Sequence, residues 1–128
     1  ARREWVDSQL QWVHRKGAMC ALDGRPGIIP GSMGSATYHV VGRGNGDSLW
    51  SSSHGAGRAM SRSEARKRIR VTDLERDVRG VWFDHRKKAR LIDEAPSAYK
   101  DISRVMRAQS ELTRIVRRLH PLLSYKGV

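Results

Sequence analysis

Residues 51–62 read SSSHGAGRAMSR, and this stretch predicts that the chain passes from a strand to a helix across a glycine-rich turn. The run SLWSSS (48–53), which leads into it, is typical of a short strand. Ser61 is followed three residues later by Glu64, which is the pattern of a reciprocal helix N-cap. We therefore expect a helix that begins near Arg62.

The turn between these elements has the composition of an anion-binding site. Gly55 and Gly57 adopt backbone angles that other residues avoid, and they let a phosphate group approach the peptide N–H groups. The following helix would direct its unpaired N–H groups toward the same space. Arg58 and Arg62 share a face if the helix begins early enough. His54 stands at the mouth of this expected phosphate pocket. Its ring either attacks phosphorus or only donates a hydrogen bond. A single H-G-x-G-R pattern does not distinguish these two roles.

The chain before this stretch predicts short strands joined by loops. The run QLQWVHRKGA (9–18) reads as a strand that stops at Gly17, and SATYHVVG (35–42) reads as a second strand. Glycines and prolines interrupt residues 21–34, so a loop is expected there, and residues 42–47 form a turn cluster.

Further helices are expected after residue 70. Thr72 and Glu75 repeat the N-cap pattern before a second short helix, and GVWFD (80–84) predicts a strand. Pro96 is expected to open a third helix, whose apolar side chains share one face at spacings of three and four residues: Ile102, Val105 and Met106.

Beyond Gln109 two interpretations stay open. The spacing of Leu112, Ile115, Val116 and Leu119 would extend the helix, whereas Ile115, Arg117 and Leu119 alternate as in a strand, and Pro121 ends either element. No internal repeat, low-complexity segment or linker divides the sequence. The pattern as a whole predicts one α+β domain of mixed short strands and helices.

The composition is that of a globular protein with a polyanionic partner. The chain has 128 residues, of which 38% are hydrophobic, and no apolar run reaches membrane-spanning length. Cys20 is the only cysteine, which excludes an internal disulfide and a thiolate metal cluster and fits a reducing compartment. The 25 Lys and Arg exceed the 13 Asp and Glu by 12, so nucleic acid is the expected partner, ahead of an anionic membrane. The alternative is a solvated basic surface without such a partner.

Six blocks, taken in order over essentially the whole chain, resemble the RtcB family of RNA ligases: WVHRKGA (12–18), IPGSMGSATY (29–38), SSSHGAGRAMSR (51–62), DEAPSAYKDI (93–102), MRAQSEL (106–112) and YKG (125–127). The resemblance implies a cytoplasmic enzyme of tRNA splicing and RNA repair. Such enzymes join RNA ends with a 2′,3′-cyclic phosphate or 3′-phosphate to RNA ends with a 5′-hydroxyl. They use GTP and Mn²⁺, with a guanylated histidine as intermediate.

The same resemblance assigns roles to individual residues. His54 matches the guanylated histidine, and Lys16, Arg58 and Arg62 match basic residues required for activity, which would hold RNA phosphates and stabilise the transferring phosphate. Tyr99 and Lys126 match residues around the guanine base. The expected nucleotide contacts are Ser32, Thr37, Ala56, Gly57, Tyr99 and Lys126, with threonine replacing the family's serine at Thr37.

The resemblance also implies that residues 1–128 are the C-terminal nucleotide-binding and guanylation segment of a larger RtcB-type fold. The manganese ligands are expected upstream, so no metal ligand is assigned here, and His14, His39, His85 and His120 receive no role. We expect the segment to be inactive without that upstream part and to expose apolar surface at Trp5 and Trp12.

Two alternative functions remain at the level of sequence. The chain could be a non-catalytic basic RNA- or nucleotide-binding fragment or a degenerate paralogue of the ligases. A generic histidine phosphotransferase would use the same His54 but would leave the other matching blocks unexplained.

Overall fold

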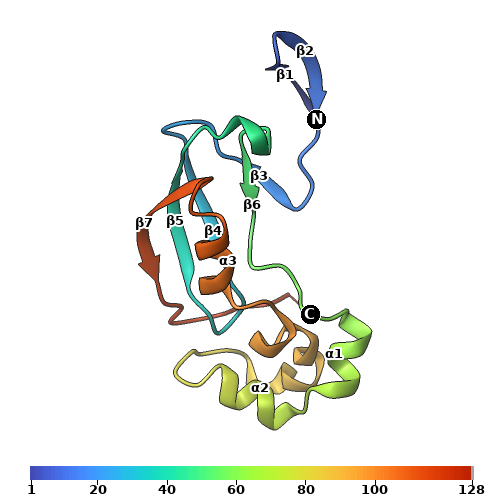
Figure 1. The fold of residues 1–128 in the computed structure, drawn as a ribbon. Coiled ribbons are helices and arrows are strands. Elements are labelled where there is room, and N and C mark those ends of the chain that lie inside the picture. Colours follow the sequence, from blue (N-terminus) through green and yellow to red (C-terminus); the bar gives the residue numbers. More distant parts are fainter. Residues whose placement is uncertain (128) are drawn as a thin grey trace.

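The computed structural model describes residues 1–127, which form small antiparallel sheets and short helices (Figure 1). The strands are β1 (Arg2–Val6), β2 (Gln9–Val13), β3 (Ala18–Cys20), β4 (Pro26–Pro30), β5 (Thr37–Gly42), β6 (Ser51–Ser53) and β7 (Thr113–Leu119). The α-helices are α1 (Arg62–Arg68), α2 (Val71–Asp77) and α3 (Ile102–Ala108). The 3₁₀ helices are η1 (Gly46–Ser48), η2 (His85–Arg90), η3 (Ile92–Glu94) and η4 (Pro96–Ala98). The expected α+β class is confirmed.

β1 and β2 form a hairpin that projects from the rest of the fold (Figure 1). Asp7 and Ser8 have φ values of 49° and 63°, as a type I′ hairpin turn requires. Arg15 ties the hairpin to the body, because its guanidinium donates to both carboxylate oxygens of Glu4 at 2.6 and 2.7 Å and to Ser51 Oγ at 2.8 Å. The hairpin exposes its tryptophans, as expected for Trp5 and Trp12.

The three-stranded sheet has the order β4-β5-β7 and buries one face against α3. Burial alternates along β5, so that Tyr38 and Val40 point inward. The core beneath the sheet contains Ile29, Ala36, Tyr38, Val40, Ala56, Ile102 and Met106. Because Ala56 belongs to this core, the glycine-rich turn is anchored to the sheet.

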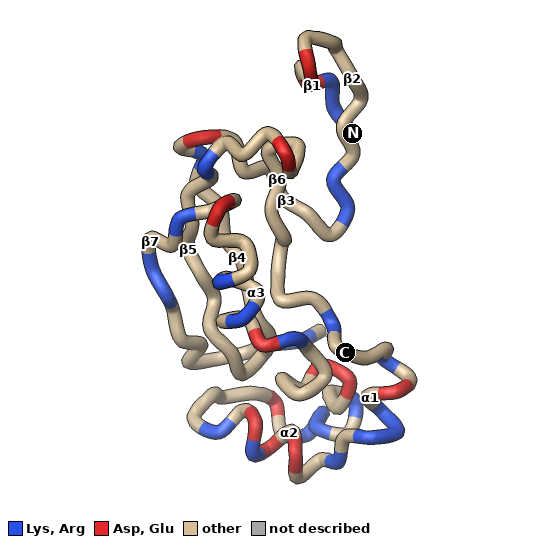
Figure 2. Tube along the Cα trace, viewed as in Figure 1, with Lys and Arg blue, Asp and Glu red and all other residues tan. Residues whose placement is uncertain are grey.

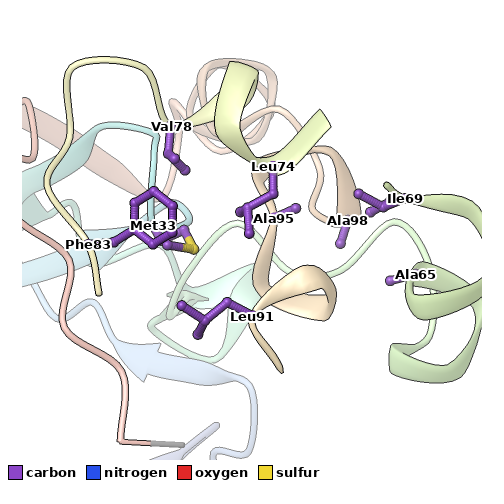
Figure 3. Packing of buried hydrophobic residues seen from close by; sticks show 9 residues of the cluster. All are labelled: Met33, Ala65, Ile69, Leu74, Val78, Phe83, Leu91, Ala95 and Ala98. Atoms are coloured by element: carbon purple, nitrogen blue, oxygen red, sulfur yellow. The ribbon is translucent and has the colours of Figure 1, made fainter. Parts of the chain in front are cut away.

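A second core joins the helices to the turn that precedes β5 (Figure 3). Leu74 and Phe83 are among its most completely buried side chains. The cluster consists of Met33, Ala65, Ile69, Leu74, Val78, Phe83, Leu91, Ala95 and Ala98. Small alanines in α1 (Ala65) and in and just before η4 (Ala98 and Ala95) let these short elements pack closely in the core.

Pairing with distant strands decided the elements that periodicity left open or misassigned. Residues after Gln109 form the strand β7, because β5 offers a free edge to which it pairs from Thr37↔Leu119 onward. The expected loop over residues 21–34 was wrong for β4. Its prolines lie at its ends and β4 is an edge strand, so their missing N–H groups remove few ladder bonds.

Other expectations need smaller corrections. Residues 80–84 form no strand but a single parallel bridge between Trp82 and Leu123. β6 begins only at Ser51, because Leu49 and Trp50 have φ values of 52° and 50°. β2 ends at Val13, before Gly17, and neither β1 nor β3 was expected.

Side-chain caps fix where the helices begin. The Ser61 cap is confirmed, because its Oγ accepts the N–H of Glu64 at 3.2 Å and α1 begins at Arg62. The second cap was misplaced: α2 begins at Val71, where an Asp73 oxygen accepts the Arg70 N–H. Pro96 opens only η4, and α3 begins later, after a carboxylate cap from Asp101.

Within residues 1–127, no helix is long and apolar enough to cross a membrane.

Replacing Leu74 with alanine should lower the free energy of unfolding by about 3 kcal/mol, because the fully buried side chain leaves a cavity between α2 and its neighbours. Urea denaturation followed by circular dichroism measures this loss. Thr72→Ala, an exposed change in the same helix, should cost less than about 0.5 kcal/mol. A similar loss for both variants would contradict the assignment of this core.

Candidate functional site

The turn that carries His54 is held in place by its backbone from three sides. The N–H of His54 donates to the carbonyl of Gly17 at 3.4 Å, and the N–H of Ala56 donates to the carbonyl of Pro30 at 3.0 Å. The carbonyl of Gly57 accepts the N–H of Lys100 at 3.0 Å. The His54 side chain itself is exposed to solvent, so the turn presents the ring while its backbone stays fixed.

The two glycines of the turn act in different ways. Gly57 has φ +71°, and a Cβ built there would meet nothing within 4 Å, so the space above it is open. Gly55 does not use the left-handed region; a Cβ there would lie 3.2 Å from the Pro30 carbonyl oxygen, so it permits a close approach. The expectation of unusual backbone angles therefore holds for Gly57 alone.

Backbone donors remain available beside His54. Ala56 already uses its N–H on Pro30, so that group is not free for the expected nucleotide contact. Among residues 1–127, the N–H groups of Gly55 and Gly57 have no hydrogen-bond partner. These two donors, together with the open space at Gly57, suit the oxygen atoms of a phosphate group.

Behind the turn lies a pair of buried carboxylates in η3, Asp93 and Glu94, which are 1% and 7% exposed. Arg62 bridges the pair, since its Nη1 lies 2.7 Å from Asp93 Oδ2 and 2.7 Å from Glu94 Oε1. Arg66 contacts Asp93 Oδ1 at 3.3 Å. Lys126 Nζ donates to Glu94 Oε2 at 3.1 Å, so the end of the chain returns to the site.

Arg58 and Tyr99 connect this pair to the turn. The guanidinium carbon of Arg58 lies 4.8 Å from the centre of the Tyr99 ring, within cation–π range. Arg58 donates to the Tyr99 hydroxyl at 3.1 Å, to the Met60 carbonyl at 3.1 Å and to the Asp93 carbonyl. The Tyr99 hydroxyl in turn donates to Glu94 Oε2 at 2.8 Å.

Arg58 and Arg62 do not share a helical face, because α1 begins only at Arg62. Arg58 instead lies in a single bridge opposite Tyr99. The two arginines meet through the acid pair, since Arg58 Nη1 is 3.7 Å and Arg62 Nη1 is 2.7 Å from Glu94 Oε1. The shared Glu94 carboxylate therefore brings the two arginines together, whereas their spacing on a helix was expected to do so.

Ionisation of the acid pair depends on these partners. Burial raises the pKa of Glu94, but the hydrogen bonds from Tyr99 and Lys126 and the nearby Arg62 charge outweigh it, so the pKa is lowered overall. Burial likewise raises the pKa of Asp93, and Arg62 and Arg66 reverse the effect. Burial and the Glu94 carboxylate raise the pKa of Tyr99. At neutral pH the cluster therefore holds two carboxylates and a protonated phenol.

The remaining expected residues flank the turn. Lys16 is exposed and directly precedes Gly17, which accepts the His54 N–H, so its backbone lies next to the histidine. Thr37, at the start of β5, pairs with Pro30, which accepts the Ala56 N–H. Ser32 lies just beyond Pro30.

Ser32 forms a tight turn that leaves its hydroxyl partly committed. Its Oγ lies 2.7 Å from Ser35 Oγ, and its N–H donates to the same oxygen. Gly31 makes this turn possible, because a Cβ there would lie 2.5 Å from Ser35 Oγ and 2.7 Å from the Ala36 carbonyl oxygen. Of the ten residues expected at the site, four meet around Glu94 and six lie along the turn or beside its backbone partners. Those around Glu94 are Arg58, Arg62, Tyr99 and Lys126, and the others are Lys16, Ser32, Thr37, His54, Ala56 and Gly57.

Sequence reasoning missed the residues that gather the site, Asp93 and Glu94. The signal was present in the sequence, because two acids stand between Leu91-Ile92 and Ala95-Pro96 in an otherwise apolar run. Carboxylates in such a run become buried and then need cationic partners. Arg66 was missed as well, because its place in the site follows from its contact with the buried Asp93.

The family described as "tRNA-splicing ligase RtcB" matches residues 1–127 of this chain. The chain belongs to the RtcB family. It is 49% identical over 116 residues to "RNA-splicing ligase RtcB" of Escherichia coli (strain K12), which covers 91% of this chain and 28% of that protein. "tRNA-splicing ligase RtcB" of Nanoarchaeum equitans (strain Kin4-M) is 39% identical over 134 residues, covering 90% and 28%. "RNA-splicing ligase RtcB" of Mycobacterium tuberculosis (strain ATCC 25618 / H37Rv) is 36% identical over 141 residues, covering 95% and 33%.

This RtcB chain thus spans about 28% of the length of the first relatives. Among residues 1–127, no group of three or more His, Cys, Asp or Glu is placed to hold a metal ion. The residues described here therefore do not fit a manganese site on their own, whereas the open turn with its free N–H groups fits a phosphate.

Glu94→Gln should destabilise this RtcB chain by about 3 kcal/mol at pH 7, because Arg62 and Lys126 lose their buried partner. The folded-state pKa of Glu94 lies below its ordinary value of 4.5, so the stabilisation is complete above about pH 4.5 and is lost as the pH falls through the folded pKa. The difference between wild type and variant should therefore shrink below pH 4.5, as measured by urea denaturation at a series of pH values.

The matched control is Glu75→Gln, which removes an exposed ion pair with Lys88 and should cost less than about 1 kcal/mol. An equal, pH-independent loss in both variants would show that Glu94 does not organise the site.

Proposed function

We propose that residues 1–128 form the nucleotide-binding and guanylation segment of a GTP-dependent RNA ligase. The enzyme joins RNA ends that carry a 2′,3′-cyclic phosphate or 3′-phosphate to RNA ends that carry a 5′-hydroxyl, in the cytoplasm, during tRNA splicing or RNA repair. The segment works together with an upstream, metal-binding part of the enzyme and is inactive without it. Membership of the RtcB family supports this proposal.

The observation that carries the proposal is the exposed ring of His54 on a turn with a fixed backbone and free N–H donors. A neutral imidazole keeps one nitrogen lone pair available for attack. Bound GTP supplies the phosphorus atom to be attacked. A bond from the ring nitrogen to the α-phosphorus forms while the bond from that phosphorus to the pyrophosphate oxygen breaks.

The chain's own groups hold the phosphate during this transfer. The N–H groups of Gly55 and Gly57, which have no partner within residues 1–127, donate to phosphate oxygens. Arg58 has five N–H donors, of which three are used within the chain, so the others remain for a phosphate. Lys16, beside His54, adds a mobile positive charge.

The nucleotide base lies against the cluster around Glu94 in this proposal. The Tyr99 ring offers a partly exposed apolar face, while its hydroxyl is used on Glu94. Lys126 gives one of its three donors to Glu94 and keeps two for the acceptor oxygen of guanine, which adenine lacks. Ser32 and Thr37 supply hydroxyl groups to the nucleotide. Arg62 adds a positive charge, which its ion pairs with Asp93 and Glu94 hold in place.

Residues 1–127 offer no fitting ligand set for manganese, so the roles assigned above belong only to the chain's own groups. The ion would be held by the upstream part, where it neutralises charge on the triphosphate. Because the metal would be held by the upstream part, we expect no activity from the segment alone.

His54→Ala should abolish a covalent adduct that forms when the protein, supplied with its upstream metal-binding part, is incubated with α-labelled GTP and Mn²⁺. The adduct should be acid-labile, as a nitrogen–phosphorus bond is, and should be detected by gel autoradiography. His85→Ala is the matched control, because it removes another exposed histidine, on η2, and should leave the adduct intact.

The competing function is a non-catalytic RNA- or nucleotide-binding fragment or degenerate paralogue, favoured by the excess of positive charge. It predicts no adduct even with the upstream part present, alongside RNA binding that weakens steeply with salt. An adduct that persists in His54→Ala would rule out His54 as the nucleophile.

A further inference from the structure

A hollow of about 400 Å³, lined in part by Tyr99, gathers positive charge. Its polar lining comes from Ser35, Tyr99, Lys100, Ser103, Arg118 and His120. Only Tyr99 among these was expected at the nucleotide site. The rest have no assigned role.

Strand pairing brings these residues together. The pair Thr37↔Leu119 sets the end of β7 beside the start of β5, so Arg118 and His120 lie next to the turn that holds Ser35. Lys100 and Ser103 come from the start of α3, which packs on the same sheet. The hollow is therefore built by three segments that are far apart in the sequence.

The cations of this hollow are not neutralised. Within residues 1–127, the two cations Lys100 and Arg118 have no ion pair or side-chain hydrogen bond with another residue, and the His120 ring has none either. Arg58 and Arg62, by contrast, are paired with the buried acids. Figure 2 shows that β7 carries basic residues and no acidic one. Free cations in a concave site favour an anionic ligand.

One acid lines the hollow, but its carboxylate is occupied. Asp101 Oδ1 accepts the N–H of Ser103 at 2.8 Å and its hydroxyl at 2.6 Å, as the cap of α3, and Oδ2 lies 3.8 Å from Arg104. The lining therefore keeps a net positive charge, and the His120 ring adds an N–H donor.

The hollow adjoins the turn that carries His54. The N–H of Lys100 donates to the carbonyl of Gly57 at 3.0 Å, so the residue that contributes a free ammonium group is anchored to the turn. Tyr99 contributes to both the hollow and the acid-pair cluster. The hollow is therefore linked to the turn by one backbone hydrogen bond and to the acid-pair cluster by one side chain.

We propose that the hollow is a subsite for a backbone phosphate of the RNA strand, held by Lys100, Arg118 and His120. It is separate from the phosphate that reacts at His54. This inference rests on the proposed function, because it takes RNA as the substrate of the site. The subsite fixes the strand while the end of the strand is positioned for joining.

The test is binding of a fluorescent single-stranded RNA with a 3′-phosphate, followed by anisotropy over a range of salt concentrations. The double variant Lys100→Ala/Arg118→Ala should weaken binding at least about 10-fold at 0.1 M salt and reduce the slope of log affinity against log salt by about 0.7 for each lost phosphate contact. Arg118→Lys, which keeps the charge, should retain most of the binding.

The matched control is Arg25→Ala/Lys67→Ala, which removes the same two charges elsewhere. Both residues are exposed, and Arg25 lies at the opposite end of the β4-β5-β7 sheet from His120. Equal losses in the two double variants would overturn the subsite and leave only a diffuse basic surface. Thermal melts check that the four exposed side chains do not support the fold.

The adduct at His54 separates this inference from the proposed function. With the upstream part present, the double variant Lys100→Ala/Arg118→Ala should form the adduct as wild type does. Loss of adduct formation with unchanged RNA binding would place the hollow in the nucleotide site and overturn the subsite. A wild type that forms no adduct but shows hollow-dependent RNA binding would overturn the proposed ligase function alone.

Discussion

The site depends on the burial of two adjacent carboxylates, Asp93 and Glu94. Carboxylates removed from water must be paired, and in this chain the pairing gathers side chains from α1, from the segment after the glycine-rich turn, and from the end of the chain. The acid pair thereby fixes a plane of cations and one aromatic ring behind the turn. Residues that are far apart in the sequence form one site because the buried carboxylates of Asp93 and Glu94 require cationic partners.

Two groups of cations near the site have different roles. The cations around the acid pair are neutralised by it, and these contacts fix their positions. Only their unused N–H donors remain for a ligand. Within the part of the chain that the structure describes, the arginines of β7 and Lys100, which precedes α3, have no ion pair, and they carry positive charge outward. The first group suits recognition of one nucleotide in a defined orientation. The second suits a polyanion whose affinity depends on salt.

Local rules predicted the parts of the fold that depend on neighbouring residues. The cap at Ser61, the strand before His54 and the alternation of β5 follow from a few adjacent side chains. The sequence could not place β4 or β7, because whether an edge strand forms depends on a partner strand many residues away. The six blocks contain most of the residues that the structure places around Glu94 and along the turn. The acid pair escaped notice because its importance comes from burial, which only tertiary packing establishes.

The most direct test of the account is a structure of this chain together with the proposed upstream part, solved with a guanosine nucleotide bound. The account predicts the α-phosphorus at bonding distance from a ring nitrogen of His54, phosphate oxygens at the N–H groups of Gly55 and Gly57, and the base beside Tyr99 and Lys126. A nucleotide bound elsewhere, or attached to another residue while the His54 ring points away, would contradict it.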